Sequence, residues 1–115
     1  MANITKNQAR ARAKEQRENV QALADQLRER ADEMRSTAEE MRALAEELRE
    51  EADYVEPYEG KDDLTEQQEE RVEWLNDQAD RLEEQADNLD EQADETDERA
   101  EELENIVTEL EEVDY

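Results

Sequence analysis

Residues 77–104 read DQADRLE, EQADNLD, EQADETD and ERAEELE, four consecutive units of seven residues. Each unit carries alanine at one position and a larger residue three places later. This spacing defines positions a and d of a heptad, which face a partner helix in a coiled coil. The a positions are Ala79, Ala86, Ala93 and Ala100, and the d positions are Leu82, Leu89, Thr96 and Leu103. The stretch therefore predicts an acidic helix with a narrow alanine and leucine seam.

A second array of the same kind lies between Val20 and Asp53. Its a positions are Ala24, Ala31, Ala38, Ala45 and Ala52, and its d positions are Val20, Leu27, Met34, Met41 and Leu48. The segment YVEPYEGKDD, residues 54–63, holds the single proline and the single glycine, and therefore predicts a turn. We predict one domain: a basic segment over 1–17 continuing into a helix over 18–53, a turn over 54–63, and an acidic helix over 64–115.

The charges beside the seam predict how the two helices pack. In an antiparallel pair, e positions face e positions, and arginines of the first helix then meet carboxylates of the second: Arg28, Arg35 and Arg42 opposite Glu83, Asp90 and Asp97. A parallel pair offers no such match. The predicted fold class is all-α, an antiparallel two-helix coiled-coil hairpin with an Ala/Leu seam.

The position of the turn sets the expected register. If the turn is centred near Gly60, Leu48 shares a layer with Val72, and Leu27 shares one with Ala93. A shift of one heptad preserves the layers but requires a longer connection. At the other end, the basic residues between positions 5 and 17 are expected beside Glu104, Glu109, Glu111, Glu112 and Asp114. The alternative is that these basic residues form an arm for nucleic acid.

Three local expectations follow from particular residues. A capping box is expected at the second helix, formed by Asp63 with Glu66 or by Thr65 with Gln68. Arg10 and Arg17 occupy seam positions, so the open end is expected to be loosely packed or frayed. Trp74 is expected to pack under the loop with Tyr54, Pro57 or Tyr58, rather than to serve as a binding anchor.

The seam by itself buries little apolar surface, because half of its residues are alanine. Leucine or isoleucine occupies position g, beside the seam, at Leu23, Leu44 and Ile106. We therefore expect these side chains to support a homodimer, in a four-helix arrangement.

Composition narrows the class of partner. The 115 residues include 39 Asp and Glu against 14 Lys and Arg, a net charge of −25. This charge disfavours nucleic acid and anionic membranes as direct partners and favours a basic protein. No apolar run approaches the roughly 18 residues of a membrane span, and the N-terminal sequence lacks the apolar stretch of a signal peptide. A cytoplasmic location is expected, the host cytoplasm if the protein is viral.

The residue types for common catalytic and metal sites are missing from the sequence. There is no histidine, no cysteine and one serine, Ser36, so the usual nucleophile and base pairs cannot form. The turn lacks the spacing of a calcium loop, and the Glu-x-x-His motif of di-metal bundles is absent. The sequence therefore predicts a protein that is not an enzyme and that has no cofactor and no specific metal site.

The charge spacing favours mimicry of DNA. Residues 62–115 carry a net charge of −21, or one charge per roughly 3.6 Å of helix, against about 3.4 Å along one DNA strand. The acidic repeats DQADRLE and EQADNLD give the chain a resemblance to the small acidic DNA-mimic proteins of bacteriophages. This resemblance implies an inhibitor that occupies the nucleic-acid-binding surface of a host protein, such as an HU-type histone-like protein, RNA polymerase or a restriction enzyme.

The hypothesis assigns ten carboxylates to the partner's lysines and arginines. They are Asp80, Glu83, Glu84, Asp87, Asp90, Glu91, Asp94, Asp97, Glu98 and Glu101. Those at position e also serve the internal arginines, whereas Asp80, Asp87, Asp94, Glu84, Glu91 and Glu98 are expected to have no internal partner. Two alternatives stay open: a structural or assembly coiled coil, and a salt-adapted coiled coil of unrelated role, for which 11 arginines against 3 lysines is typical.

Overall fold

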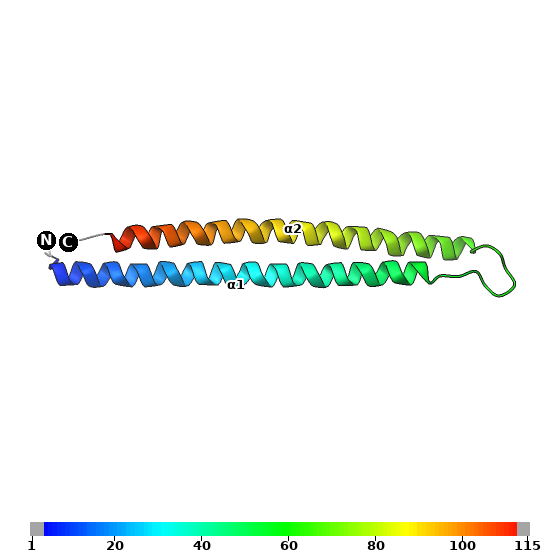
Figure 1. The fold of residues 1–115 in the computed structure, drawn as a ribbon, viewed down its shortest axis with the longest axis horizontal. Helices are drawn as coiled ribbons and strands as arrows, with labels where there is room; N and C mark the ends of the chain where they lie inside the picture. The colour runs from blue at the N-terminus through cyan, green and yellow to red at the C-terminus, as the bar shows by residue number, and fades with distance from the viewer. Residues whose placement is uncertain (1–3, 113–115) are drawn as a thin grey trace. The chain divides into compact units, whose positions relative to one another are not determined.

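The computed structural model describes residues 4–112, and these residues form two helices joined by a loop. Helix α1 spans Lys6–Asp53 and helix α2 spans Glu66–Glu111 (Figure 1). The two helices pack as an antiparallel hairpin, joined by ion pairs from one helix to the other. The predicted all-α hairpin is therefore confirmed.

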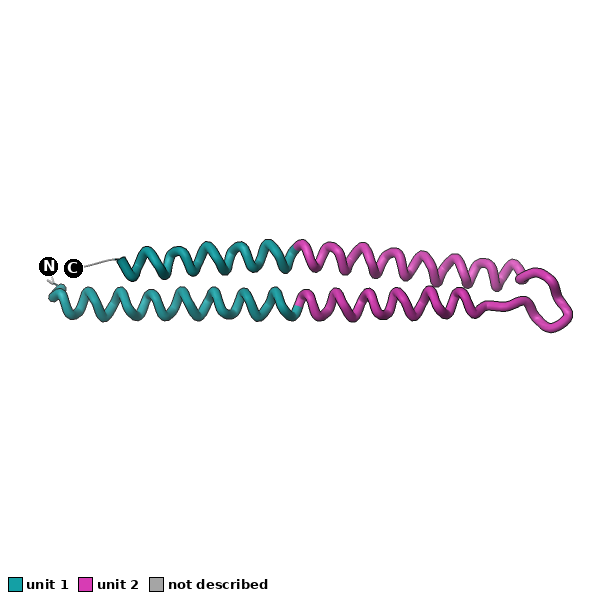
Figure 2. The backbone as a smooth tube through the Cα atoms, in the orientation of Figure 1, with its two compact units in different colours: residues 1–33, 92–115 teal, residues 34–91 magenta. Residues whose placement is uncertain are grey.

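The hairpin divides into two compact units, shown in different colours in Figure 2. Unit 1 consists of Met1–Glu33 and Gln92–Tyr115, and unit 2 consists of Met34–Glu91. Each unit contains a segment of α1 paired with a segment of α2, and unit 2 also contains the loop.

The core of each unit is made of alanine. The nine alanines at position a are 0–4% exposed: Ala24, Ala31, Ala38, Ala45, Ala52, Ala79, Ala86, Ala93 and Ala100. Most d residues are only half-buried; the exceptions are Leu75 at 2% exposed and Thr96 at 6%. Because a methyl group lets the two backbones approach closely, the longer d side chains extend past the seam. The hydroxyl of Thr96 donates to the carbonyl of Gln92 at 2.8 Å and is thereby satisfied.

The register differs from the predicted one by a single heptad. Arg42 binds Asp90 rather than Glu83, and Arg28 binds Glu104 rather than Asp97. Following the same heptad positions along the helices places Ala45 in the layer of Leu82, and Ala52 in the layer of Leu75. The expected layers of Leu48 with Val72 and Leu27 with Ala93 are therefore wrong.

The connection between the helices explains this shift. It covers residues 54–65, two more than the predicted turn, and α2 begins at Glu66 rather than at about Leu64. The side-chain amide of Gln68 donates to the carbonyl of Glu56 at 2.9 Å, which holds the loop beside the first turn of α2. Because the loop runs beside the first turn of α2, that turn does not pair with α1. The residues of α2 that do pair with α1 are therefore about one heptad further along the chain than predicted. Gly60, with φ of 80°, supplies the left-handed residue that the bend requires.

Thr65 and Gln68 form the capping box of α2. The hydroxyl of Thr65 accepts from the Gln68 N–H at 3.1 Å, and the Gln68 side-chain oxygen accepts from the Thr65 N–H at 2.9 Å. The alternative box of Asp63 with Glu66 is wrong, because the helix begins at Glu66. A second capping box, which the sequence analysis missed, starts α1: Gln8 N–H donates to Thr5 Oγ1 at 3.2 Å, and Thr5 N–H donates to the side-chain oxygen of Gln8 at 3.0 Å.

Replacing Thr65 with alanine is expected to lower the free energy of unfolding by about 1 kcal/mol, because the backbone N–H of Gln68 loses its hydroxyl acceptor. Urea titration followed by helical circular dichroism measures the change. Thr37, exposed in the middle of α1, provides the control: Thr37→Ala should be neutral or slightly stabilising, because alanine is the better helix former. Equal losses of unfolding free energy in Thr65→Ala and Thr37→Ala would contradict the capping role of Thr65.

The open end of unit 1 departs from the expected charge pairing. The backbone carbonyl of Leu110 accepts from Arg17 at 3.5 Å, so the first turns of α1 extend past the last described residues of α2 (Figure 1). Lys14 and Arg17 lie beside Glu111 in a shallow groove, but Glu104 pairs with Arg28 instead of with the basic segment. The predicted contact with Asp114 lies outside the described residues.

The expected loose packing of this end is confirmed. Between Ile4 and Glu18, three residues are partly buried, Ala9, Ala13 and Arg17, and the others are exposed. This end of α1 is nevertheless helical from Lys6 onward.

Candidate functional site

A row of ion pairs joins the two helices along one side of the seam. We call it the arginine ladder, and define it by its basic and acidic members in turn: Arg28, Arg42 and Arg49 of α1, and Asp80, Glu83, Asp87, Asp90 and Glu104 of α2. The three arginines occupy position e of their heptads. The ladder therefore follows directly from the seven-residue repeat of both helices.

In unit 2, each ladder arginine binds two carboxylates that are three residues apart on α2. Arg49 binds Asp80 at 2.7 Å and also binds Glu83. Arg42 binds Asp87 at 2.8 Å and Asp90 at 2.6 Å. Residues three apart lie on one helix face, so the forked guanidinium reaches both carboxylates at once.

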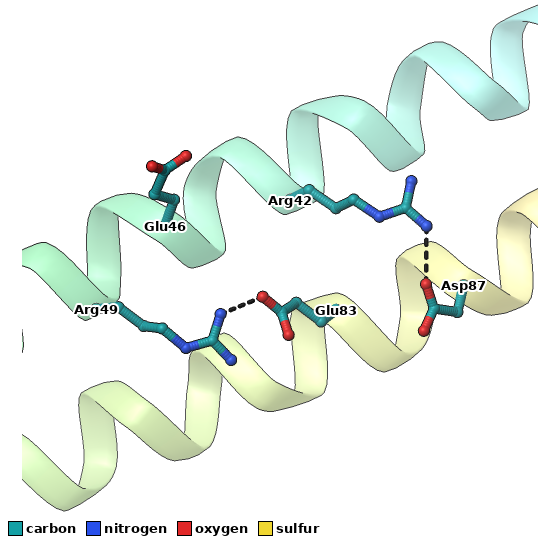
Figure 3. A pocket seen from close by; sticks show the side chains of 5 residues that line it. All are labelled: Arg42, Glu46, Arg49, Glu83 and Asp87. Atoms are coloured by element: carbon teal, nitrogen blue, oxygen red, sulfur yellow. Dashed lines mark hydrogen bonds and ion pairs between the residues drawn. The ribbon is translucent and has the colours of Figure 1, made fainter.

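Figure 3 shows this part of the ladder from close by. Arg42 and Arg49 reach from α1 toward α2, whereas Glu46, on α1 itself, points away from both. Together with Glu83 and Asp87 they line a shallow groove. Guanidinium and carboxylate groups of this kind can bind ions or charged side chains.

In unit 1, Arg28 binds Glu104, with Nε to Oε1 at 2.8 Å. The hydrogen bond to Glu104 raises the pKa of Arg28, and the charges of Asp97 and Glu101 add to the effect. Glu101 therefore contributes to the electrostatics of the ladder, although it is exposed.

The pKa of the other two arginines is raised in the same way. Hydrogen bonds to Glu83 and then Asp80 raise the pKa of Arg49, and bonds to Asp87 and then Asp90 raise that of Arg42. A raised pKa in the folded state means that the stabilisation is complete below the pKa of the unfolded chain and is lost as pH rises through the folded value. For arginine this window lies at extreme alkaline pH, so the guanidinium side of the ladder stays charged at physiological pH.

The ladder corrects part of the predicted binding face. Asp80 and Asp87 were expected to have no internal partner, which is wrong, since both bind ladder arginines. Asp94 also makes a polar or electrostatic interaction within the chain, as does Asp97. The carboxylates at position f, Glu84, Glu91 and Glu98, are exposed and lie outside the ladder.

The double contacts were missed because the prediction paired e positions only with e positions. The signal for them is in the sequence, in the spacing of Asp80 to Glu83 and of Asp87 to Asp90. Two carboxylates three residues apart, repeated every heptad, present a fork-shaped acceptor to each arginine. Their partner arginines depend on the register, which the sequence leaves ambiguous by one heptad.

Substitutions of equal charge change can isolate the ladder's contribution. We expect Arg49→Glu to lower the melting temperature more than Arg81→Glu does, because Arg49 bridges two carboxylates whereas Arg81 is exposed at position c. The difference should shrink in 1 M NaCl, where the Debye length falls to about 3 Å. Thermal unfolding at two salt concentrations measures it, and equal melting temperatures at low salt would refute the stabilising role.

The expectation for Trp74 is wrong. Its side chain is 58% exposed, and Tyr54 and Tyr58 are 79% and 62% exposed. Trp74 occupies the outward position c of its heptad, so only a minor part of the indole is covered.

Among residues 4–112, no group of three or more acidic side chains is arranged to hold a metal ion. Neither α1 nor α2, as described, combines the length and apolar character needed to cross a membrane. No protein-family model matches the chain, and no match was found among curated proteins or among solved structures.

Proposed function

We propose that this protein is a DNA mimic that occupies the nucleic-acid-binding surface of a basic protein and blocks its binding to DNA. The observation that carries the proposal is the unequal charge of the two helices. Helix α2 holds 20 carboxylates against 3 arginines, whereas α1 holds 13 carboxylates against 10 basic residues. The net charge of α2 amounts to one per about 4 Å of helix, close to the roughly 3.4 Å spacing of phosphates along one strand.

The ladder narrows the proposed binding face. Asp80, Glu83, Asp87 and Asp90 are engaged by arginines of α1, so a partner gains less attraction from them than from carboxylates outside the ladder. The exposed carboxylates that lie outside the ladder are the better candidates. We call five of them, at positions c and f of α2, the outer row: Glu84, Glu91, Glu95, Glu98 and Glu102.

Positions in the heptad place the outer row away from α1. Glu84, Glu91 and Glu98 occupy position f, opposite the seam, and Glu95 and Glu102 occupy the neighbouring position c. Within unit 1, Glu95, Glu98 and Glu102 follow one another at intervals of three and four residues. They form a continuous acidic stripe that a row of lysines or arginines can follow.

The test is capture of DNA-binding proteins. The protein is immobilised, exposed to a bacterial lysate at about 0.1 M salt, and eluted with duplex DNA, because a mimic and DNA compete for one site and such binding depends steeply on salt. We expect DNA-binding proteins in the eluate. Recovery of none would contradict the proposal.

Two triple variants of equal charge then test the face. The variant Glu84→Gln/Glu91→Gln/Glu98→Gln removes three carboxylates of the outer row. Its control, Glu33→Gln/Glu40→Gln/Glu47→Gln, removes three exposed carboxylates with the same seven-residue spacing from α1. We expect the α2 variant to bind the captured protein more weakly than the control. Equal loss in both would indicate attraction by net charge alone, without a directed face.

A second candidate function, self-assembly, rests on the exposed apolar side chains at position g. Leu23 is 52% exposed, Leu44 44% and Ile106 43%. In unit 1, Leu23 lines a shallow groove with Leu27 and Leu103. Such side chains favour a homodimer in which they pack between two hairpins. Sedimentation at physiological salt tests this, and a stable folded monomer would rule it out.

A further inference from the structure

Exposed aromatic side chains gather at the loop end of unit 2. The sequence contains four aromatic residues, three tyrosines and one tryptophan. Tyr54, Tyr58 and Trp74 are each more than half exposed. We call these three residues the aromatic tip. None of them contributes to the alanine seam or to the arginine ladder, so the packing of the hairpin does not account for them.

The backbone at the tip is fixed by hydrogen bonds. The N–H of Tyr54 donates to the carbonyl of Glu50 at 3.0 Å, which continues the last turn of α1. The carbonyl of Tyr58 accepts from the N–H of Lys61 at 2.9 Å, closing a turn that contains Gly60. Gln68 ties the loop to α2 through Glu56. The aromatic rings are therefore displayed from a defined framework.

Heptad positions place two of the rings on one side of the hairpin. Tyr54 follows α1 at position c, and Trp74 occupies position c of α2. Position c lies next to position g, and at this level the g residues are Glu51 and Arg71, which form an ion pair at 2.8 Å. Tyr54 and Trp74 thus flank the Glu51–Arg71 pair on the side of the hairpin opposite to the ladder.

The surroundings of the tip are strongly anionic. Residues 50–77 contain 12 carboxylates against two basic residues, Lys61 and Arg71, and Arg71 is bound by Glu51. The negative charge repels an anionic ligand, and it gives a neutral apolar ligand no electrostatic attraction. A cationic side chain is attracted both by the carboxylates and by the face of the indole or phenol ring.

We propose that the aromatic tip anchors an arginine or lysine side chain of the basic partner. This inference rests on the proposed function, and it assigns different tasks to two surfaces. The outer row attracts the partner over a distance and tolerates many arrangements of charge. The tip supplies a short-range contact with a defined geometry, of the kind that tryptophan, tyrosine and arginine make at the centres of protein interfaces.

Trp74 makes the tip directly observable, because it is the single tryptophan of the chain. The experiment titrates the full-length protein with a nona-arginine peptide at about 0.1 M NaCl, recording the heat of binding and the tryptophan emission together. We expect the emission to change and to saturate at the same peptide concentration as the heat.

Substitutions provide the second arm. Trp74→Ala should weaken binding of the peptide by roughly two- to fivefold, the range of an exposed cation–π contact. Trp74→Phe should weaken binding of the peptide less than Trp74→Ala does, because phenylalanine retains an aromatic face. The control is Ile4→Ala, which removes another exposed apolar side chain and should leave the affinity unchanged. Circular dichroism verifies that each variant is helical.

The outcomes separate the two proposals. Absence of binding, with neither heat nor a change in emission at any peptide concentration, would overturn the attraction to basic partners, and with it the proposed function. Binding heat with unchanged emission, and with equal affinity for Trp74→Ala, would overturn only the tip. Emission that changes when the free protein is diluted, but not when peptide is added, would assign the tip to contact between copies and would also overturn it.

Discussion

Replacing Leu75 with alanine is expected to lower the free energy of unfolding by about 2–5 kcal/mol, the range for truncating a buried leucine. Leu75 is 2% exposed and is the one leucine among the buried residues of the described chain. The register places it in the layer of Ala52, whose methyl group cannot fill the space that the truncation leaves. The cavity is therefore expected to persist, and the loop end of unit 2 should lose most of its hydrophobic contribution.

The matched control is Leu44→Ala, the same substitution at a side chain that is 44% exposed. This variant should change the unfolding free energy less, because close to half of the Leu44 surface is already exposed to water. Urea denaturation, followed by circular dichroism and by the emission of Trp74, measures both variants in the same buffer. A loss for Leu75→Ala no larger than that for Leu44→Ala would contradict the burial of Leu75 in the seam.

Enlarging a seam alanine is expected to produce the second large effect. Ala38 is fully buried, and Ala38→Leu adds three carbon atoms to a layer in which the helices approach closely. Such overpacking typically costs about 1–3 kcal/mol. Helices that are forced apart also weaken the pairs of Arg42, which lies one turn along α1 from residue 38 and reaches across to Asp90.

Ala43→Leu provides the control, because Ala43 lies exposed on the opposite face of α1. Both variants introduce the same side chain into the same helix, so their intrinsic helix propensities change equally. We expect Ala43→Leu to alter stability by less than about 0.5 kcal/mol. Thermal unfolding compares the stability of the two variants. If Ala38→Leu were as stable as Ala43→Leu, this would contradict close packing at the alanine seam.

Much of the fold could be predicted from the repeat. Alanine at nine a positions marks the buried face of each helix, and the arginines at position e mark the side that faces a carboxylate row. Pro57 and Gly60 separate the two helices. These features are local, and a helix of 3.6 residues per turn converts their spacing directly into faces. The direction of packing followed as well, because only the antiparallel arrangement matches opposite charges along the seam.

The candidate site could be predicted only in part. Position e carboxylates such as Glu83 and Asp90 were expected to serve the arginines, and they do so. Asp80 and Asp87 were assigned to an external partner and are bound internally instead. The exposure of Trp74 was not foreseen either, because the path of the loop over α2 decides which side chains it covers.

The sequence by itself determined the two helices, their buried faces and their antiparallel charge match, since each depends on spacing within one repeat. The tertiary structure alone decided the register and, through it, the partner of each arginine. A heptad repeat looks the same after a shift of seven residues, so every such shift preserves the alanine layers and the charge match. The loop over residues 54–65, held to α2 by the bond from Gln68 to Glu56, removes that degeneracy.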